Sequence, residues 1–315
     1  MNVLVTGGAG FIGSNLVRSL AAQGDTVTVF DNLSTGSTAN LAELNGSARL
    51  VEGDVRDADA VARSADGIEV IYHLAALPSV ARSVDDPTTS HAVNVDGTLN
   101  VLQAARSAGA RRVVFASSSS VYGDTPTLPK HEEMPVSPRS PYAASKLAAE
   151  AYCRSFAHSY GLETVSLRFF NVFGPRQDPA SEYSAAIPRF VTRMLSGRPA
   201  VIFGDGRQSR DFTFVSNAVQ ACLLSASSGP ASSGEAFNVG CGSRITLVEL
   251  VELLGEIIGG APEPEFAQPR TGDVRDSEAA VAKAGELLGY RPLVGVREGL
   301  EETVRWFARP HAVAV

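Results

Sequence analysis

The chain has 315 residues, of which 44% are hydrophobic and 19% charged, and its net charge at pH 7 is −7. This length exceeds what one domain usually needs, so we expect between one and two domains. The acidic balance argues against a nucleic-acid-binding protein, and no apolar run approaches the roughly 18 residues of a membrane span. Three scattered cysteines and five dispersed histidines predict neither a disulfide framework nor a metal site. With no signal peptide before the first strand-like segment, we expect a cytoplasmic protein.

The first 31 residues predict a dinucleotide-binding unit. Residues 2–6 form a short apolar run, glycines follow at positions 7, 10 and 13, and residues 14–22 have a helical pattern. This glycine spacing lets the backbone approach a pyrophosphate at the N-terminus of the helix. The next predicted strand, 26–30, ends at Asp31. Its carboxylate can hydrogen-bond ribose hydroxyls of an adenosine, which favours NAD over NADP.

Strands and helices go on alternating, which predicts an α/β fold with a doubly wound parallel sheet. We expect further strands at 49–53, 70–74 and 112–116. Asp54 and Val55 follow the first of these strands, where an adenine ring would lie. The small residues Ala75 and Ala76 follow the second and would allow a cofactor to come close.

A helix is predicted over residues 90–108, and its Asn94 could face the nicotinamide or be an ordinary surface polar group. The serines at 117–120 follow the last predicted strand, at the sheet edge where catalytic groups gather in open α/β folds. Serine is also common in plain loops.

Tyr142 and Lys146 lie four residues apart in a predicted helix, so both side chains share one face. An ammonium beside a phenol favours the phenolate, which brings a group with a pKa of about 10 closer to neutral pH. Such a pair can remove a proton from an alcohol. The same spacing also arises by chance on amphipathic helices, so the interpretation depends on the rest of the chain.

Five motifs together resemble the extended short-chain dehydrogenase/reductase family, and most of all its nucleotide-sugar 4-epimerases. They are TGGAGFIG at 6–13, HLAA at 73–76, SSSSVYG at 117–123, SPYAASK at 140–146 and RFFNVFGPRQDP at 168–179. The resemblance covers almost the whole chain. It implies a Rossmann-type NAD-binding domain over 1–170, joined by a returning strand near 235–240, and a smaller mixed α/β domain over 171–315 that is mainly responsible for binding a UDP-sugar.

The resemblance also implies roles for single residues. Tyr142 would remove the proton of the sugar 4-hydroxyl, Lys146 would lower the pKa of Tyr142 and hold the nicotinamide ribose, and Ser118 would share the proton relay. The implied NAD contacts are Gly7, Gly10, Phe11, Ile12, Gly13, Asp31, Asn32, Asp54, Val55, Leu74, Ala75, Ala76, Asn94, Tyr142, Lys146 and Phe170.

Two positions within the serine motif distinguish the reactions of the family. Related 4,6-dehydratases carry an Asp-Glu pair where this chain has Ser119 and Ser120, and decarboxylases carry a glutamate at the position of Ser120. A hydroxyl cannot replace a carboxylate in acid/base work at neutral pH. The resemblance therefore favours inversion at C4 through a transient 4-keto sugar, with a retained NAD.

Substrate contacts are implied in both domains. In the family Asn171, Arg210 and Arg270 would contact the diphosphate, although the two arginines could instead form surface ion pairs. Phe203 would lie near the base, and Asp273 would bind the ribose. The full implied set is Ser79, Ser118, Ser119, Ser120, Tyr142, Asn171, Ala186, Ile187, Phe203, Arg210, Arg270 and Asp273.

Two positions bear on the sugar. Ser277 matches a gatekeeper of the family, where a small residue admits 2-acetamido sugars without requiring them. Asp178 would repel a uronate, though Arg82 or Arg176 could supply a positive partner. We predict a UDP-GlcNAc/UDP-GalNAc or UDP-glucose/UDP-galactose 4-epimerase, with UDP-glucuronate as the alternative substrate. Another nucleotide-sugar reaction of this family, or a non-catalytic NAD-binding protein, remains a further alternative because the fold alone does not fix the function.

The family resemblance also implies a homodimer built through an intersubunit four-helix bundle. Helices near 92–108 and 142–160 offer the apolar residues Leu99, Leu102, Tyr152 and Phe156 for this bundle. The same residues could equally face the core of their own chain.

Overall fold

The computed structural model of the protein describes residues 1–44, 46–179, 186–260, 262–268 and 274–309. Its larger body is built on a seven-stranded sheet with the order β11-β6-β5-β4-β1-β2-β3, in which every neighbouring pair is parallel. The strands are β1 (Asn2–Thr6), β2 (Thr26–Asp31), β3 (Ala48–Glu52), β4 (Val70–His73), β5 (Arg112–Ser118), β6 (Glu163–Phe169) and β11 (Glu235–Val239). The predicted doubly wound α/β class is confirmed, and β11 lies beside β6 at the edge of this sheet.

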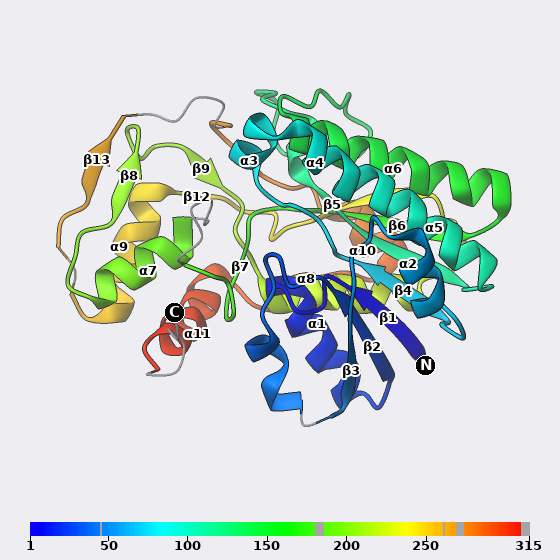
Figure 1. The fold of residues 1–315 in the computed structure, drawn as a ribbon. Coiled ribbons are helices and arrows are strands. Elements are labelled where there is room, and N and C mark those ends of the chain that lie inside the picture. The colour runs from blue at the N-terminus through cyan, green and yellow to red at the C-terminus, as the bar shows by residue number, and fades with distance from the viewer. Residues whose placement is uncertain (45, 180–185, 261, 269–273, 310–315) are drawn as a thin grey trace.

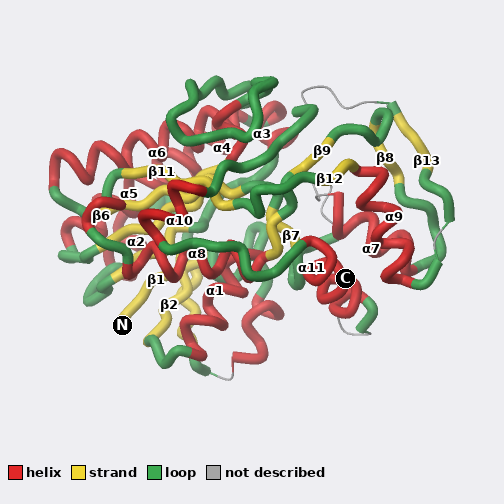
Figure 2. Tube along the Cα trace, turned by 180° about the vertical axis from the view of Figure 1, so that it is seen from behind, coloured by secondary structure: helices red, strands yellow, loops and turns green. Residues whose placement is uncertain are grey.

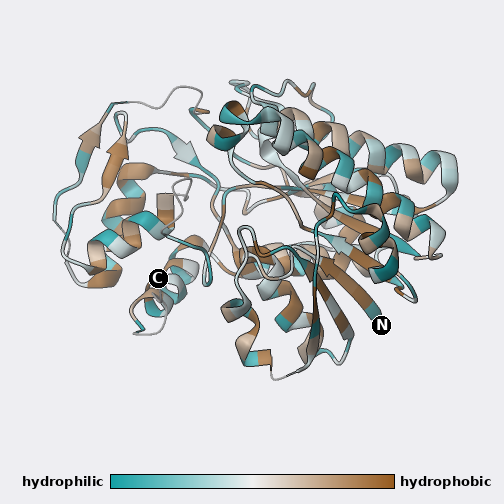
Figure 3. Ribbon diagram, in the orientation of Figure 1, coloured by the Kyte–Doolittle hydropathy of each residue, from teal (hydrophilic) through white to brown (hydrophobic). Residues whose placement is uncertain are grey.

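Helices cover both faces of the sheet (Figure 1). One face is covered by α1 (Phe11–Ala22), α8 (Val215–Ser227) and α10 (Ala282–Leu288), and the other by α2 (Ala58–Ser64), α5 (Gly97–Ser107) and α6 (Pro141–Tyr160). Because helices shield both faces, the central strands are mostly apolar, and Figure 3 shows them in the hydrophobic colour.

The predicted helix over 90–108 is divided in the structure. Short helices α3 (Val80–Asp85) and α4 (Pro87–His91) lead into a π-helical turn, η2 (Ala92–Asp96), and α5 begins only after it. Such wide turns insert an extra residue into a helix and often mark functional positions. Here the turn contains Asn94.

A smaller body lies beside the C-terminal ends of the strands, with its own apolar core (Figures 1 and 2). It contains α7 (Ala186–Leu195), α9 (Leu247–Ile258), α11 (Val296–Phe307) and three two-stranded sheets. These sheets pair β7 (Val172–Phe173) with β10 (Thr213–Phe214), β9 (Ser209–Arg210) with β12 (Ile245–Thr246), and β8 (Val201–Phe203) with β13 (Glu265–Ala267). The 3-10 turns are η1 (Thr38–Leu44), η3 (Ser119–Tyr122) and η4 (Pro230–Ser232).

Local sequence fixes the ends of the helix that carries the predicted catalytic pair. Ser140 caps α6 by accepting a hydrogen bond from the backbone N–H of Ala143 at 3.1 Å, and Pro141 occupies the first turn. The helix ends at Gly161, whose left-handed φ of 70° suits glycine. None of the helices in the described part of the chain is long and apolar enough to cross a membrane.

Candidate active site

The glycine-rich turn between β1 and α1 is packed as a cradle for a diphosphate. A Cβ atom on Gly13 would lie 2.1 Å from the carbonyl oxygen of Gly7, and one on Gly7 would lie 2.6 Å from the backbone nitrogen of Ala75. At Gly10 a Cβ would meet only the Gly7 carbonyl, at 3.2 Å. Gly10 begins α1 with no side-chain cap, so the first N–H groups of the helix are left for an anion. These residues fit a dinucleotide cofactor.

Asp31 closes this cradle at the end of β2. Its carboxylate is buried and accepts hydrogen bonds from the backbone N–H of Ala9, at 2.9 Å, and of Leu33, at 2.8 Å. The same carboxylate therefore orders the glycine-rich turn from inside the protein. Each carboxylate oxygen can accept more than one bond, so a ribose hydroxyl can still be accommodated there.

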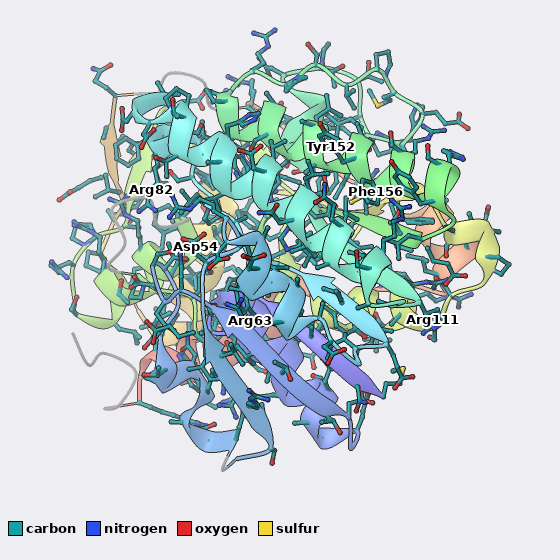
Figure 4. The ribbon with its side chains drawn as sticks, turned by 45° about the vertical axis from the view of Figure 1, so that its right-hand side comes forward. Asp54, Arg63, Arg82, Arg111, Tyr152 and Phe156 are labelled. Carbon is teal, nitrogen blue, oxygen red and sulfur yellow. The ribbon has the colours of Figure 1, made fainter. Side chains whose placement is uncertain are left out.

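Asn32 and Asp54 lie next to Asp31 at the end of the neighbouring strands. The Asn32 amide donates to Asp54 at 3.0 Å, and Arg56 donates to the same carboxylate at 2.7 Å. The hydrogen bond from Arg56 lowers the pKa of Asp54 to about 2. A cavity of about 220 Å³ opens here between Asn32 and Arg56 on one side and Arg82 on the other. Figure 4 shows Asp54 and Arg82 at this place.

Asn94 is buried, so its interpretation as a surface polar group is wrong. Its Oδ1 atom accepts from the backbone N–H of Leu77 at 2.9 Å, and its Nδ2 atom donates to the hydroxyl of Ser145 at 3.0 Å. Asn94 therefore ties the loop that follows β4 to the helix that carries Tyr142 and Lys146. The chain segment of Leu74, Ala75 and Ala76 lies in that loop.

Tyr142 and Ser118 meet at the start of α6. Burial raises the pKa of the Tyr142 phenol above its ordinary value, and the hydrogen bond with Ser118 opposes this shift. The backbone N–H of Tyr142 donates to the hydroxyl of Ser83, at 2.9 Å, which fixes the first turn of the helix against α3. The Tyr142 side chain is half-buried, and a phenol with a raised pKa stays neutral until a partner takes up its proton.

Lys146 lies one helical turn further along α6 and is also buried. Its ammonium donates to the backbone carbonyl of Ala116 at 2.8 Å and lies 4.9 Å from the centre of the Phe115 ring. Burial lowers the pKa of Lys146 to about 8. The structure thus brings together all three predicted catalytic residues. The pKa of Tyr142 is raised by burial and lowered by Ser118.

Three of the four serines of 117–120 make side-chain contacts that lie in two directions. Ser118 caps the turn η3 and accepts from the hydroxyl of Ser120 at 2.9 Å, so these two lie on the side of Tyr142. Ser117 points the other way and donates to the carboxylate of Glu150 at 2.9 Å. Arg168 also binds Glu150, through Nε at 3.1 Å and Nη2 at 2.5 Å.

Asn171 follows the core residue Phe170 and has a left-handed φ of 34°. Its side-chain amide donates to the backbone carbonyl of Asp211 at 3.0 Å and to the hydroxyl of Ser277 at 3.1 Å. The buried Asp211 carboxylate in turn accepts three backbone N–H bonds, from Cys241, Gly242 and Ala279. The residue expected to bind the diphosphate is therefore held by contacts between distant segments.

The other predicted substrate contacts that the structure describes are dispersed over both bodies. Ser79 caps α3. Ala186 begins α7, and the next residue, Ile187, is buried in the core of the smaller body. Arg210 in β9 donates to the backbone carbonyls of Ser209 and Arg275, and Phe203 ends β8. Arg270 and Asp273 lie outside the described residues.

Arg176 faces away from this site. Its guanidinium donates to Asn15 on α1 at 3.0 Å and lies 4.6 Å from the centre of the Trp306 ring on α11. Together they line a separate cavity of about 470 Å³ between α1, α8 and α11. Arg176 is thus not placed to pair with a sugar carboxylate.

Sequence reasoning missed several polar residues that position the site. Ser83 holds the backbone of Tyr142, and Ser145 links α6 to Asn94. His73 belongs to the HLAA motif, yet no role followed from its type alone. The structure places it between the hydroxyls of Thr6 and Thr98.

The fold and the site define a Rossmann-type enzyme with a tyrosine, a lysine and a serine at the ends of its central strands. The model of the NAD dependent epimerase/dehydratase family matches residues 3–240. The chain belongs to this family, as its motifs predicted, and NAD is its cofactor.

Three relatives are similar over nearly the whole chain. A UDP-glucose 4-epimerase of Mycolicibacterium smegmatis is 45% identical over 311 residues, 98% of each sequence. The crystal structure of a UDP-glucose 4-epimerase with UDP-glucose from Thermotoga maritima is 41% identical, covers 98% of both chains and has a TM-score of 0.93. A UDP-N-acetylglucosamine 4-epimerase from Methanobrevibacter ruminantium, in complex with UDP-N-acetylmuramic acid, is 40% identical over 97% of both chains, with a TM-score of 0.92.

Proposed function

We propose that this protein inverts the configuration at C4 of a UDP-sugar through a transient 4-keto sugar. The observation that carries the proposal is the position of Tyr142 beside Ser118, one helical turn from the buried Lys146 ammonium. The relatives above support it, because their names give UDP-sugar 4-epimerases of two substrate types.

Each of the three residues has a separate task in this proposal. Tyr142, as the phenolate, takes the proton of the 4-hydroxyl group and later returns it, while Ser118 holds the tyrosine ring in place and shortens the path of the proton. Lys146 supplies the positive charge that favours a phenolate. NAD, when bound, supplies the hydride acceptor and donor. The protein therefore has to hold the cofactor firmly and let the 4-keto sugar turn before the hydride returns.

Elimination and decarboxylation need a carboxylate near the sugar, and the described residues around Ser118 argue against one at this position. The positions after Ser118 carry the hydroxyls of Ser119 and Ser120. The nearby carboxylate of Glu150 lies behind Ser117 and is bound by the guanidinium of Arg168. A carboxylate neutralised in this way is a poor acid or base for the substrate.

We infer that the preferred substrate is a neutral UDP-sugar, UDP-glucose or UDP-GlcNAc, with UDP-glucuronate as the alternative. Arg176 is bound to Asn15 and Trp306, away from Tyr142. Arg82 lines the cavity beside Asn32, at the predicted adenosine end of the cofactor site. Ser277 keeps a small side chain next to Asn171, which leaves room for a 2-acetamido group.

Proton NMR of the purified protein with UDP-glucose, UDP-GlcNAc and UDP-glucuronate in separate tubes, without added NAD, tests this proposal. We expect the anomeric signal of the C4 epimer with one or both neutral sugars, and its loss in Tyr142→Phe. Turnover of UDP-glucuronate alone would contradict the neutral-sugar preference. No conversion in any tube, even after NAD is added, would exclude the epimerase assignment for these three sugars.

We also propose that the protein forms a homodimer through α5 and α6. Of the four predicted interface residues, Leu102 and Phe156 are buried in the core of their own chain, while Tyr152 is 40% exposed (Figure 4). Tyr160 is 51% exposed, and the guanidinium of Arg106 on α5 covers its ring at 4.0 Å. These aromatic side chains suit an interface. Light scattering at micromolar concentration should give twice the monomer mass, and Tyr152→Glu should lower it to that of the monomer.

A further inference from the structure

A chain of buried polar groups, formed by five side chains and one backbone carbonyl, runs through the core of the larger body. Its members are Thr6, His73, Thr98, Asn94 and Ser145, and each is at most 4% exposed. Buried polar groups are paired as a rule, so their pairing alone requires no functional explanation. The two ends of this series of hydrogen bonds point to a function. Thr6 precedes the glycine-rich turn, and Ser145 lies on the catalytic helix α6.

The hydrogen bonds define one direction of donation along the chain. The Thr98 hydroxyl lies 2.6 Å from the backbone carbonyl of Asn94, which can only accept, so Thr98 donates its single proton there. The 3.0 Å contact between Thr98 and Nε2 of His73 then requires the imidazole to donate. His73 carries its proton on Nε2, and its Nδ1 accepts from the Thr6 hydroxyl at 2.7 Å.

Beyond Asn94 the chain reaches the catalytic tyrosine. The Asn94 amide donates to the Ser145 hydroxyl at 3.0 Å, and Ser145 donates to the backbone carbonyl of Tyr142 at 2.8 Å. At the other end, the Thr6 hydroxyl accepts from the backbone N–H of Ala75 at 3.3 Å, next to Gly7.

We propose that His73 is a positioning residue that fixes the catalytic turn of α6 relative to the cofactor loops, through Thr6 on one side and Thr98 on the other. The inference rests on the proposed function, because its consequence is the distance between Tyr142 and the cofactor. A misplacement of about 1 Å between reacting groups can lower a rate about 100-fold, so a rigid link between the two binding elements has catalytic value.

This arrangement works only with a neutral imidazole. Burial lowers the pKa of His73 to about 3, and the positive charge of Lys146 adds to the shift. The Phe115 ring packs against His73 at 5.7 Å and lies under the Lys146 ammonium. A protonated His73 would present a second donor to Thr6 and would repel Lys146. The link therefore stays intact throughout the pH range in which Lys146 changes its charge.

A pair of matched variants distinguishes a loss of activity through misplaced residues from a loss of stability alone. Thr98→Val removes the hydroxyl between His73 and Asn94 and keeps the shape of the side chain. Thr303→Val is the control, because Thr303 is also buried and also donates to the carbonyl four residues earlier, that of Gly299, in the distant helix α11. We expect both variants to lower the melting temperature. Only Thr98→Val should lower kcat, about 10-fold with an unchanged KM for the UDP-sugar, and lower the NAD content of the purified protein.

Two further results complete the test. Thr98→Ser keeps a hydroxyl at this position and should have the kcat and the NAD content of the unmodified protein. This expectation can be checked even if Thr98→Val does not fold. Equal kcat and NAD content in the two valine variants would overturn the proposal. NAD content is measured without any sugar, so this readout remains valid if none of the tested UDP-sugars is converted.

The tautomer can be measured independently of turnover. In protein labelled with ¹⁵N-histidine, long-range ¹H–¹⁵N correlation spectra should show His73 protonated on Nε2 alone and unchanged from pH 5.5 to 9. A titration of His73 near its ordinary pKa of 6.5, or a proton on Nδ1, would refute the directional chain.

Discussion

Among the described residues, the Glu–Arg ion pairs Glu150–Arg168 and Glu256–Arg297 have the same length but lie in very different surroundings. Glu150 and Arg168 are joined at 2.5 Å, with side chains 12% and 6% exposed, and Glu256 and Arg297 are also joined at 2.5 Å, with side chains 64% and 57% exposed. Glu150 lies on α6 and Arg168 on β6, so the buried pair attaches the catalytic helix to the sheet. We predict that Glu150→Gln and Glu256→Gln have clearly different effects on stability.

The expected difference follows from burial. Glu150→Gln leaves the Arg168 guanidinium buried without its counter-charge, which destabilises by about 3–5 kcal/mol. Glu256→Gln removes an exposed pair worth about 0–1 kcal/mol. Unfolding entropy of about 2.1 cal/mol/K per residue over 315 residues amounts to about 0.66 kcal/mol/K. The Tm should therefore fall by about 5–8 °C in Glu150→Gln and by less than about 2 °C in Glu256→Gln.

Differential scanning calorimetry of the two variants at one ionic strength measures this difference. The double variant Glu150→Gln/Arg168→Met removes the uncompensated charge and should regain part of the lost Tm. Equal shifts in the two single variants would refute the argument from burial. So would a double variant that melts below Glu150→Gln.

Three further predictions concern the cofactor turn, the lysine and the smaller body. Gly13→Ala should abolish NAD retention, because the added Cβ would lie 2.1 Å from the carbonyl oxygen of Gly7. The NAD released from the purified variant is measured by HPLC, and a full complement of bound NAD would contradict the cradle geometry. Burial lowers the pKa of Lys146 from 10.5 to about 8, so between these pH values the unfolded chain binds more protons than the folded chain. The contribution of Lys146 to the free energy of unfolding therefore rises from pH 8 to pH 10.5. Urea unfolding of Lys146→Met should lack this rise. Asp211→Asn should leave at least one of three buried backbone N–H groups unpaired and destabilise the fold by about 1–3 kcal/mol. It should also raise the KM for the UDP-sugar. An unchanged KM would show that Asp211 does not support substrate binding.

The sequence was sufficient for the fold because the signals that define it are local. Alternating strands and helices, and glycines at fixed spacing before a helix, are short-range patterns. The strands that begin at residues 2, 26, 70 and 112 therefore lie where they were predicted. Likewise, Tyr142 and Lys146 share one helix, and their common face follows from the helical period alone.

Long-range pairing explains what the sequence did not show. Asn171 is held by Asp211 and Ser277, which lie 40 and 106 residues further along the chain. His73 is paired with Thr6 and Thr98, 67 and 25 residues away. A single sequence carries no periodic signal for such partners. The π-helical turn at Asn94 was also missed, and its Asn94 likewise bonds to the distant residues Leu77 and Ser145.

Three separate polar contacts hold α6 along its length, and none of them involves the smaller body. Ser83 binds the backbone of Tyr142, the Asn94 side chain binds Ser145, and Arg168 binds Glu150. By contrast, those residues predicted to contact UDP that the structure describes lie on the smaller body and at its border, where Asn171 joins the two. The proposed reaction requires this division. The proton and hydride positions must stay fixed relative to NAD, while the 4-keto sugar turns over between two hydride transfers. A rigid α6 on the sheet and a sugar held mainly through its nucleotide satisfy both requirements in one chain.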